Sequence, residues 1–97
     1  MGSKKALKDP ETLALDGLAF LAASKDELAR FVENSGIAPD ELRARADEPA
    51  VLSAVLGFLL SDDQRLLAFC AEQGFDAKQV HAAHYALEHR QKFNRSS

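Results

Sequence analysis

The segment from Pro49 to Leu60, which reads PAVLSAVLGFLL, strongly limits how this chain folds. It contains no charged side chain and only one hydroxyl, Ser53, so a helix formed here is apolar around nearly its whole circumference. Such a helix belongs in the interior of a fold. Membrane spans need about 17 to 25 apolar residues, whereas Glu48 and Asp62 close this run on either side. We therefore predict a central buried helix.

The composition predicts one all-helical domain. A chain of 97 residues is long enough for one hydrophobic core without disulfides or metals. The aromatic residues are six Phe and one Tyr with no Trp, and Leu, Ala and Val supply most of the other apolar side chains. We expect an all-α fold, a bundle of five or six helices over residues 9–93. Residues 1–8 and 94–97 are predicted to be flexible ends.

The expected helices begin at polar caps or prolines, and several end at glycine. Serine or aspartate before a helix, and glycine after it, satisfy backbone groups that the helix leaves unpaired. The predicted signals are Asp9-Pro10-Glu11, a capping box at Ser24 with Glu27, Gly36, Pro39-Asp40-Glu41, Asp47-Glu48-Pro49, a second capping box at Ser61 with Gln64, Gly74, and Asp76 with Gln79 before a last helix to about Gln91.

The chain also carries the pattern of an internal repeat. Residues 9–46 align with residues 47–84 at a constant shift (47 − 9 = 38) without a gap. The coinciding residues are core and turn residues, which suggests one unit of three helices present twice. The matched pairs include Phe20 with Phe58, Leu21 with Leu59, Leu28 with Leu66, Phe31 with Phe69, and Gly36 with Gly74. We predict a pseudo-symmetric bundle with the first and fourth helices at its centre.

Four stretches of the sequence resemble a small family of bacterial domains of unknown function, about a hundred residues long. They are ETLAL at residues 11–15, LAFL at residues 18–21, Gly36-Ile37 with Pro39 and Leu42-Arg43, and LGFLLSD at residues 56–62. The resemblance spans residues 10–87 and rests on helix starts and core residues. Gly17 and Gly57 stand where the family pattern more often has alanine and an acidic residue. The resemblance implies a helical fold and no activity, cofactor or catalytic residue.

Charge and cysteine usage favour a cytoplasmic protein with a protein partner. The net charge of −3 disfavours nucleic acid and anionic membranes as general partners. The single Cys70 cannot form an internal disulfide, which is typical of a reducing compartment. Acidic residues interrupt the apolar residues after Lys4 and Lys5, so we predict no signal peptide.

The first functional hypothesis is a non-enzymatic protein-interaction module. The last predicted helix is locally basic and carries large side chains where its core pattern fades. We expect Tyr85, Arg90, Lys92 and Phe93 to contact the partner. No phosphate-binding loop, nucleophile beside a base, or paired carboxylates occur, so we predict no enzyme and no cofactor. The oligomeric state stays open.

Two alternatives use the last helix differently. The helices around Gly74 have the spacing of a DNA-binding helix-turn-helix, which would present Lys78, Gln79 and His81 to a groove. The nearby acidic residues work against phosphate contacts. The third hypothesis is a metal site, because His81, His84 and Glu88 lie within about 60° of one another on a helix.

Overall fold

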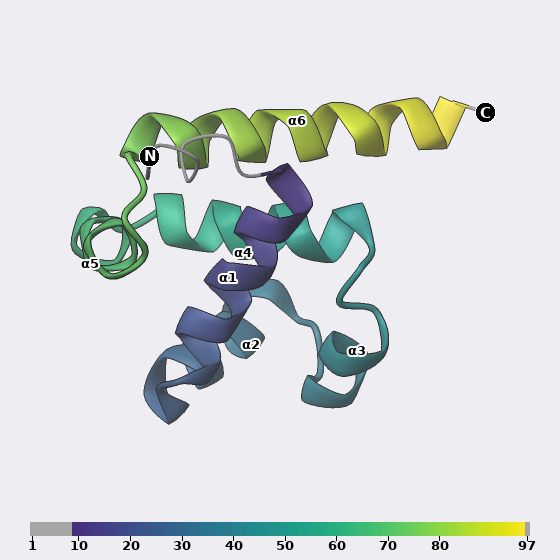
Figure 1. Ribbon diagram of the computed structural model, residues 1–97. Coiled ribbons are helices and arrows are strands. Elements are labelled where there is room, and N and C mark those ends of the chain that lie inside the picture. The colour runs from purple at the N-terminus through teal and green to yellow at the C-terminus, as the bar shows by residue number, and fades with distance from the viewer. Residues whose placement is uncertain (1–8, 97) are drawn as a thin grey trace.

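The computed structural model describes the backbone of residues 9–96 and the side chains of residues 9–89, and the described chain contains helices but no strand. This confirms the all-α prediction. The six helices of the described part are α1 (Pro10–Ala22), α2 (Lys25–Ser35), α3 (Pro39–Ala44), α4 (Pro49–Leu60), α5 (Asp63–Gln73) and α6 (Ala77–Ser96) (Figure 1). None of these helices combines the length and the apolar character that crossing a bilayer requires.

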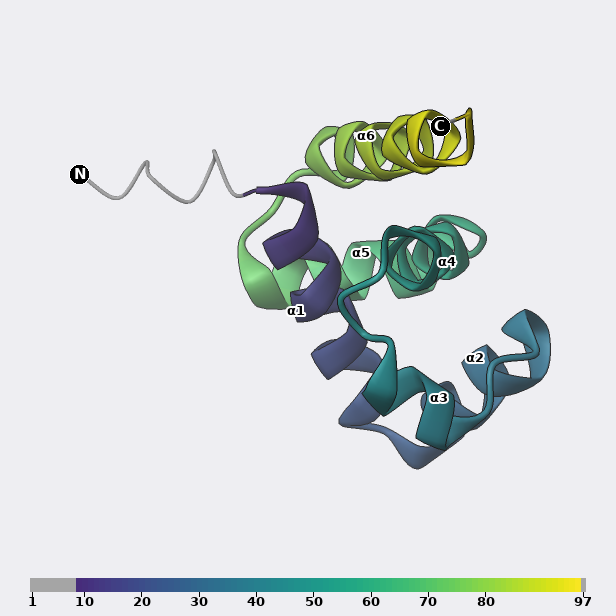
Figure 2. The same cartoon turned by 90° about the vertical axis from the view of Figure 1, so that its right-hand side faces the viewer.

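Helix α4 is the centre of the fold, as its apolar sequence predicts. It packs against α1, α2, α5 and α6, and Figures 1 and 2 show α6 running along one side of it. Most of its side chains are removed from water: Val51, Leu52, Ser53, Val55, Leu56, Phe58 and Leu59 are all buried. Burying an aliphatic or aromatic side chain contributes about 1.5 to 3 kcal/mol, so α4 supplies much of the folding free energy.

Helix α1 crosses α4 at short range because it carries a glycine there. A Cβ atom added at Gly17 would lie 3.0 Å from Cδ1 of Leu59 and 3.2 Å from Cγ1 of Val55. Leu59 and Val55 are both fully buried, so neither can move aside easily. Gly17 therefore sets the distance between the two central helices.

The two predicted glycine stops are confirmed. Gly36 ends α2 with φ of 76°, and Gly74 ends α5 with φ of 78°. Both values lie in the left-handed region, which glycine adopts without the steric cost that a Cβ atom brings. In each case the glycine N–H donates to the carbonyl four residues back, that of Val32 or Cys70.

The predicted cap of α5 is wrong by one residue. Asp62, not Ser61, is the N-cap, and its carboxylate accepts from the amides of Gln64 at 2.9 Å and Arg65 at 3.3 Å. Ser61 still belongs to the end of α4, where its hydroxyl donates to the carbonyl of Phe58 at 2.7 Å. Serine and aspartate are about equally good caps, so the sequence did not separate them.

The capping box at Ser24 is half confirmed. The Ser24 hydroxyl accepts from the amide of Glu27 at 3.4 Å. The Glu27 carboxylate does not reach back to Ser24 but forms an ion pair with Arg65 of α5. The Arg65 guanidinium also lies 4.1 Å from the centre of the Phe58 ring. Its side chain is only 12% exposed, and a partly buried cation needs such partners.

Two aromatic pairs tie the helices together. Phe20 of α1 meets Phe69 of α5 with ring centroids 5.4 Å apart, and Phe31 of α2 meets Phe58 of α4 at the same distance. The ring planes cross at 61° and 63°, an edge-to-face arrangement that aromatic rings favour. The four phenylalanines predicted to form the core therefore pack as two pairs.

Helix α6 packs on α4 and α1 through Val80, Ala83 and Leu87, the predicted apolar stripe. Its backbone is helical to Ser96, past the predicted end near Gln91. Residues 1–8 and 97, and the side chains of residues 90–97, lie outside the described part of the structure. Two sets of predictions therefore lie outside the described part: the flexible end at residues 1–8, and the roles of side chains beyond residue 89.

Candidate functional site

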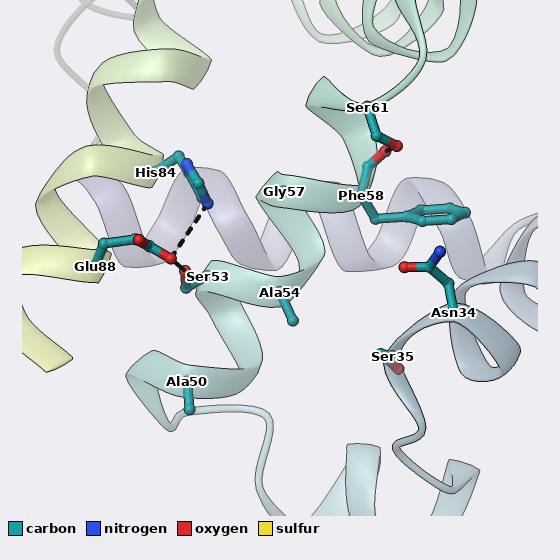
Figure 3. A pocket seen from close by; sticks show the side chains of 10 residues that line it. All are labelled: Asn34, Ser35, Ala50, Ser53, Ala54, Gly57, Phe58, Ser61, His84 and Glu88. Carbon is teal, nitrogen blue, oxygen red and sulfur yellow. Dashed lines mark hydrogen bonds and ion pairs between the residues drawn. The ribbon is translucent and has the colours of Figure 1, made fainter.

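An open groove runs along one side of α4, between α6 and the end of α2 (Figure 3). Its volume is about 430 Å³. The floor consists of small residues of α4, namely Ala50, Ala54, Gly57 and Ser61, and Ser53 and Phe58 of the same helix also line the groove. His84 and Glu88 of α6 form one wall, and Asn34 and Ser35 of α2 form the other.

The floor is long and shallow because its residues follow the helical repeat. Steps of four, three and four residues place Ala50, Ala54, Gly57 and Ser61 on one face of α4. At 1.5 Å per residue the stripe is about 16 Å long. None of the four has a side chain larger than a hydroxymethyl group. A Cβ atom added at Gly57 would lie 3.4 Å from Nε2 of His84 and would narrow the groove there.

Three polar side chains meet at the wall that α6 forms. The hydroxyl of Ser53 donates to Oε2 of Glu88 at 3.0 Å, and Nε2 of His84 lies 3.7 Å from the same oxygen (Figure 3). Ser53 is 4% exposed, and among the described residues it is the one buried polar side chain. The Glu88 side chain is 51% exposed. The buried hydroxyl therefore holds a carboxylate that still faces water.

This cluster orients a carboxylate and does not activate a nucleophile. In a hydrolytic triad the histidine lies between the serine and the acid, so that it takes the serine proton. Here Glu88 lies between Ser53 and His84, and the serine proton already points at the carboxylate. The geometry therefore suits the binding of a group at Glu88 better than acyl transfer at Ser53.

The predicted metal ligands are not brought together. His84 and Glu88 are neighbours, but His81 is exposed and does not line the groove. Across residues 9–89 no three His, Cys, Asp or Glu side chains form a group that could hold a metal ion. His84 and Glu88 instead form the pair expected of residues four apart on one helix.

Of the predicted partner residues, Tyr85 is described and exposed. Its side chain is 68% exposed and stacks on His89, with ring centroids 5.5 Å apart. Tyr85 does not line the groove, and three residues along a helix turn it about 60° away from Glu88 around α6. Arg90, Lys92 and Phe93 have side chains outside the described part.

The residues of the nucleic-acid alternative have different surroundings. Lys78 and His81 are exposed on α6. Gln79 is half-buried, and its side-chain oxygen accepts from the amide of Asp76 at 2.8 Å, so it caps the start of α6 as predicted. Asp76 is itself exposed beside Lys78, and Glu72 is exposed on α5.

Cys70 is a structural thiol in this fold. It is 8% exposed in the core, on α5. Burial raises the pKa of the Cys70 thiol above its ordinary value, and the negative charge of Asp76 raises it further. Because the thiolate is the reactive form, both effects make Cys70 a poor nucleophile at neutral pH.

Sequence reasoning missed most of the groove. Ser53 is the one hydroxyl of the apolar segment, but the sequence predicts no partner for it. The regular spacing of small residues in α4 was the other available signal. Neither signal says which face of α4 the neighbouring helices leave open, so the role of Asn34, Ser35, Ala50, Ala54 and Gly57 appears only in the folded chain.

Residues 7–90 match the model of a family described as "Protein of unknown function (DUF3572)". The chain belongs to this family. The resemblance inferred from the helix starts and the LGFLLSD segment is thereby confirmed. No curated protein and no solved structure shows significant similarity to the chain. The family description carries no activity, so function has to be argued from the geometry of the domain.

In this DUF3572 domain, the LGFLLSD segment at residues 56–62, one of the four stretches that carry the resemblance, is part of the core. Leu56, Phe58 and Leu59 are buried, and Asp62 caps α5. These residues specify the fold of α4 and its junction with α5. Gly57, between them, faces the groove and is one of the two positions, with Gly17, where this chain departs from the family pattern described above.

Proposed function

We propose that this domain is a non-enzymatic protein-interaction module that binds a segment of a partner protein in the groove along α4. The groove itself is the observation that carries the proposal. A floor of small residues about 16 Å long, open to solvent and bounded by two helices, lets the backbone of a helical or extended segment approach α4 closely.

Tyr85 supports an interface at this place. It is a large side chain with two-thirds of its surface in water, and it lies on α6, the helix that supplies His84 and Glu88 to the wall of the groove. Tyrosine is enriched among residues that contribute strongly to protein interfaces. We include the basic and aromatic residues Arg90, Lys92 and Phe93, which follow in the sequence of α6, in the proposed surface.

The same reasoning favours binding over catalysis and the cytoplasm over a secreted location. The polar cluster places a carboxylate between serine and histidine, which is the wrong order for a triad. The one cysteine is buried and unpaired, as is usual for a protein kept in a reducing compartment.

The proposal also includes the internal repeat. Under the shift of 38 residues, Phe20 corresponds to Phe58 and Phe31 to Phe69. The pair Phe20–Phe69 therefore corresponds to the pair Phe58–Phe31, and both have the same distance and nearly the same ring angle. Such exchanged contacts are expected if two copies of a helical hairpin pack about a pseudo-twofold axis. The third helices differ, since α3 ends at Ala44 whereas α6 is long.

Affinity capture from a lysate of the encoding organism, treated with nuclease, tests the proposed surface. Two matched pairs of variants use exposed positions: Ala50→Phe in the groove against Ala71→Phe on α5, and Tyr85→Ala against Leu67→Ala, where Leu67 is 62% exposed. We expect a discrete protein that is retained by the wild type and both α5 variants and reduced at least fivefold by Ala50→Phe and Tyr85→Ala.

Two outcomes contradict the proposal. Equal losses of the captured protein in Ala50→Phe on α4 and in its control Ala71→Phe on α5 would mean that the groove does not contact the partner. Recovery of nucleic acid alone, lost with rising salt and sensitive to Lys78→Ala, would favour the helix-turn-helix alternative on α5 and α6.

A further inference from the structure

We infer that the wall of the groove at Glu88 receives a lysine or arginine side chain of the partner segment. The inference deepens the proposed function and rests on it for the identity of the partner. It is carried by the way Ser53, His84 and Glu88 are arranged beside the floor of alanine and glycine residues.

Charge at the groove favours a cation. Among the residues that line it, Glu88 is the one acidic side chain, and no lysine or arginine contributes to the lining. An ammonium or guanidinium group would form a charge-assisted hydrogen bond with this carboxylate, which is stronger than a bond between neutral groups. A partner carboxylate at the same point would be repelled.

The orientation of Glu88 leaves room for such a group. Both the Ser53 hydroxyl and the His84 ring approach Oε2, and the hydrogen bond and the ion pair found for Glu88 among residues 9–89 both use this oxygen and not Oε1. Ser53 is buried under the groove and restrains the carboxylate, so less conformational entropy is lost when a ligand binds.

The floor fits the remainder of a long basic side chain. Ala50, Ala54 and Gly57 line the same groove as Glu88 with methyl groups and backbone. Lysine and arginine commonly lay their methylene stems along such apolar surface while the charged head stays near water. An aliphatic side chain would instead cover the carboxylate without satisfying it, which costs free energy.

The test uses side-chain analogues and the whole domain. n-Butylammonium and methylguanidinium chloride are titrated at constant ionic strength while the backbone amide signals of Ser53, Ala54 and Gly57 are followed by NMR. We expect saturable shifts at these amides. Glu88→Gln should weaken binding at least fivefold, whereas Glu72→Gln, which removes an exposed carboxylate on α5, should leave it unchanged. Sodium propionate should produce no saturable shift.

Several results overturn the inference. Shifts that do not saturate, that persist in Glu88→Gln, or that appear equally at other carboxylates would show unspecific ion pairing. If the amines fail to bind while partner capture still depends on Ala50, the proposed function stands and the basic side chain is refuted. If amine binding depends on Glu88 but Ala50→Phe leaves capture of the partner unchanged, the site binds small cations and the proposed interaction in the groove is refuted.

Discussion

Replacing Gly57 by alanine should stabilise the domain, whereas the same change at Gly17 should not. Both glycines lie inside helices, where alanine is favoured over glycine by about 0.8 to 1.0 kcal/mol. The added Cβ atom at position 57 would meet Nε2 of His84 at 3.4 Å, at the edge of ordinary van der Waals contact. His84 is only partly buried and can yield. We therefore expect Gly57→Ala to gain about 0.5 to 1 kcal/mol of unfolding free energy.

At Gly17 the packing term opposes the helix propensity. The Cβ atom would lie 3.0 Å from Leu59 and 3.2 Å from Val55, which are both fully buried. Overpacking of a dense core costs about 1 to 3 kcal/mol. When the gain in helix propensity is subtracted from this cost, Gly17→Ala should lower the free energy of unfolding by about 0 to 2 kcal/mol.

Urea and thermal denaturation followed by circular dichroism measure both variants. For a domain of this size 1 kcal/mol corresponds to about 4 to 8 °C in Tm, so Gly57→Ala should melt about 2 to 8 °C higher than the wild type. Gly17→Ala should melt at or below the wild-type temperature. Equal shifts of the same sign would refute the packing described around these glycines. Because the new methyl group at position 57 enters the groove, Gly57→Ala should also bind the partner less well despite its greater stability.

Three further predictions concern the core. Phe31→Ala and Phe69→Ala should each lower the free energy of unfolding, measured by urea denaturation, by about 3 to 5 kcal/mol, because both rings are fully buried. If the two residues are equivalent members of a repeat, the two losses should agree within about 1 kcal/mol. A larger difference would count against equivalence. Arg65→Glu should destabilise the domain by about 1 to 3 kcal/mol, since it places a carboxylate against the partly exposed Glu27. Adding Glu27→Arg should recover at least half of this loss. No recovery would mean that the ion pair contributes little to stability. Because burial raises the pKa of the Cys70 thiol, Ellman's reagent should react with Cys70 at pH 7.5 at least tenfold more slowly in the native protein than in urea. The pKa of this thiol is higher in the folded state than in the unfolded state. Its contribution to stability is therefore present below the unfolded pKa and is lost as the pH rises through the folded pKa.

The fold was predictable where local rules decide it. The apolar sequence of α4 predicts a buried helix, and Gly36 and Gly74 predict the ends of α2 and α5, because these preferences act within one turn of helix. The sequence predicts the cap of α5 one residue too early, because Ser61 and Asp62 are adjacent and equally suited to the position.

The groove was not predictable in the same way. It exists because α2 and α6 pack on α4 without covering the face of Ala50, Ala54 and Gly57, and this depends on contacts between distant segments. The Ser53–Glu88 hydrogen bond joins residues 35 apart, and Glu27 meets Arg65 at a separation of 38. Helical spacing places a residue on a face but does not identify the neighbour of that face.

Site-specific photo-crosslinking is the most direct test of the groove as the partner site. A benzophenone amino acid is placed at position 34, an exposed position in the wall of the groove, or at position 71 on α5, and the protein is irradiated in nuclease-treated lysate of the encoding organism. The account predicts a discrete crosslinked protein from position 34, identified by mass spectrometry, and at least fivefold less of it from position 71. Equal crosslinking from both positions, or none from position 34 while the partner is still captured, would contradict it.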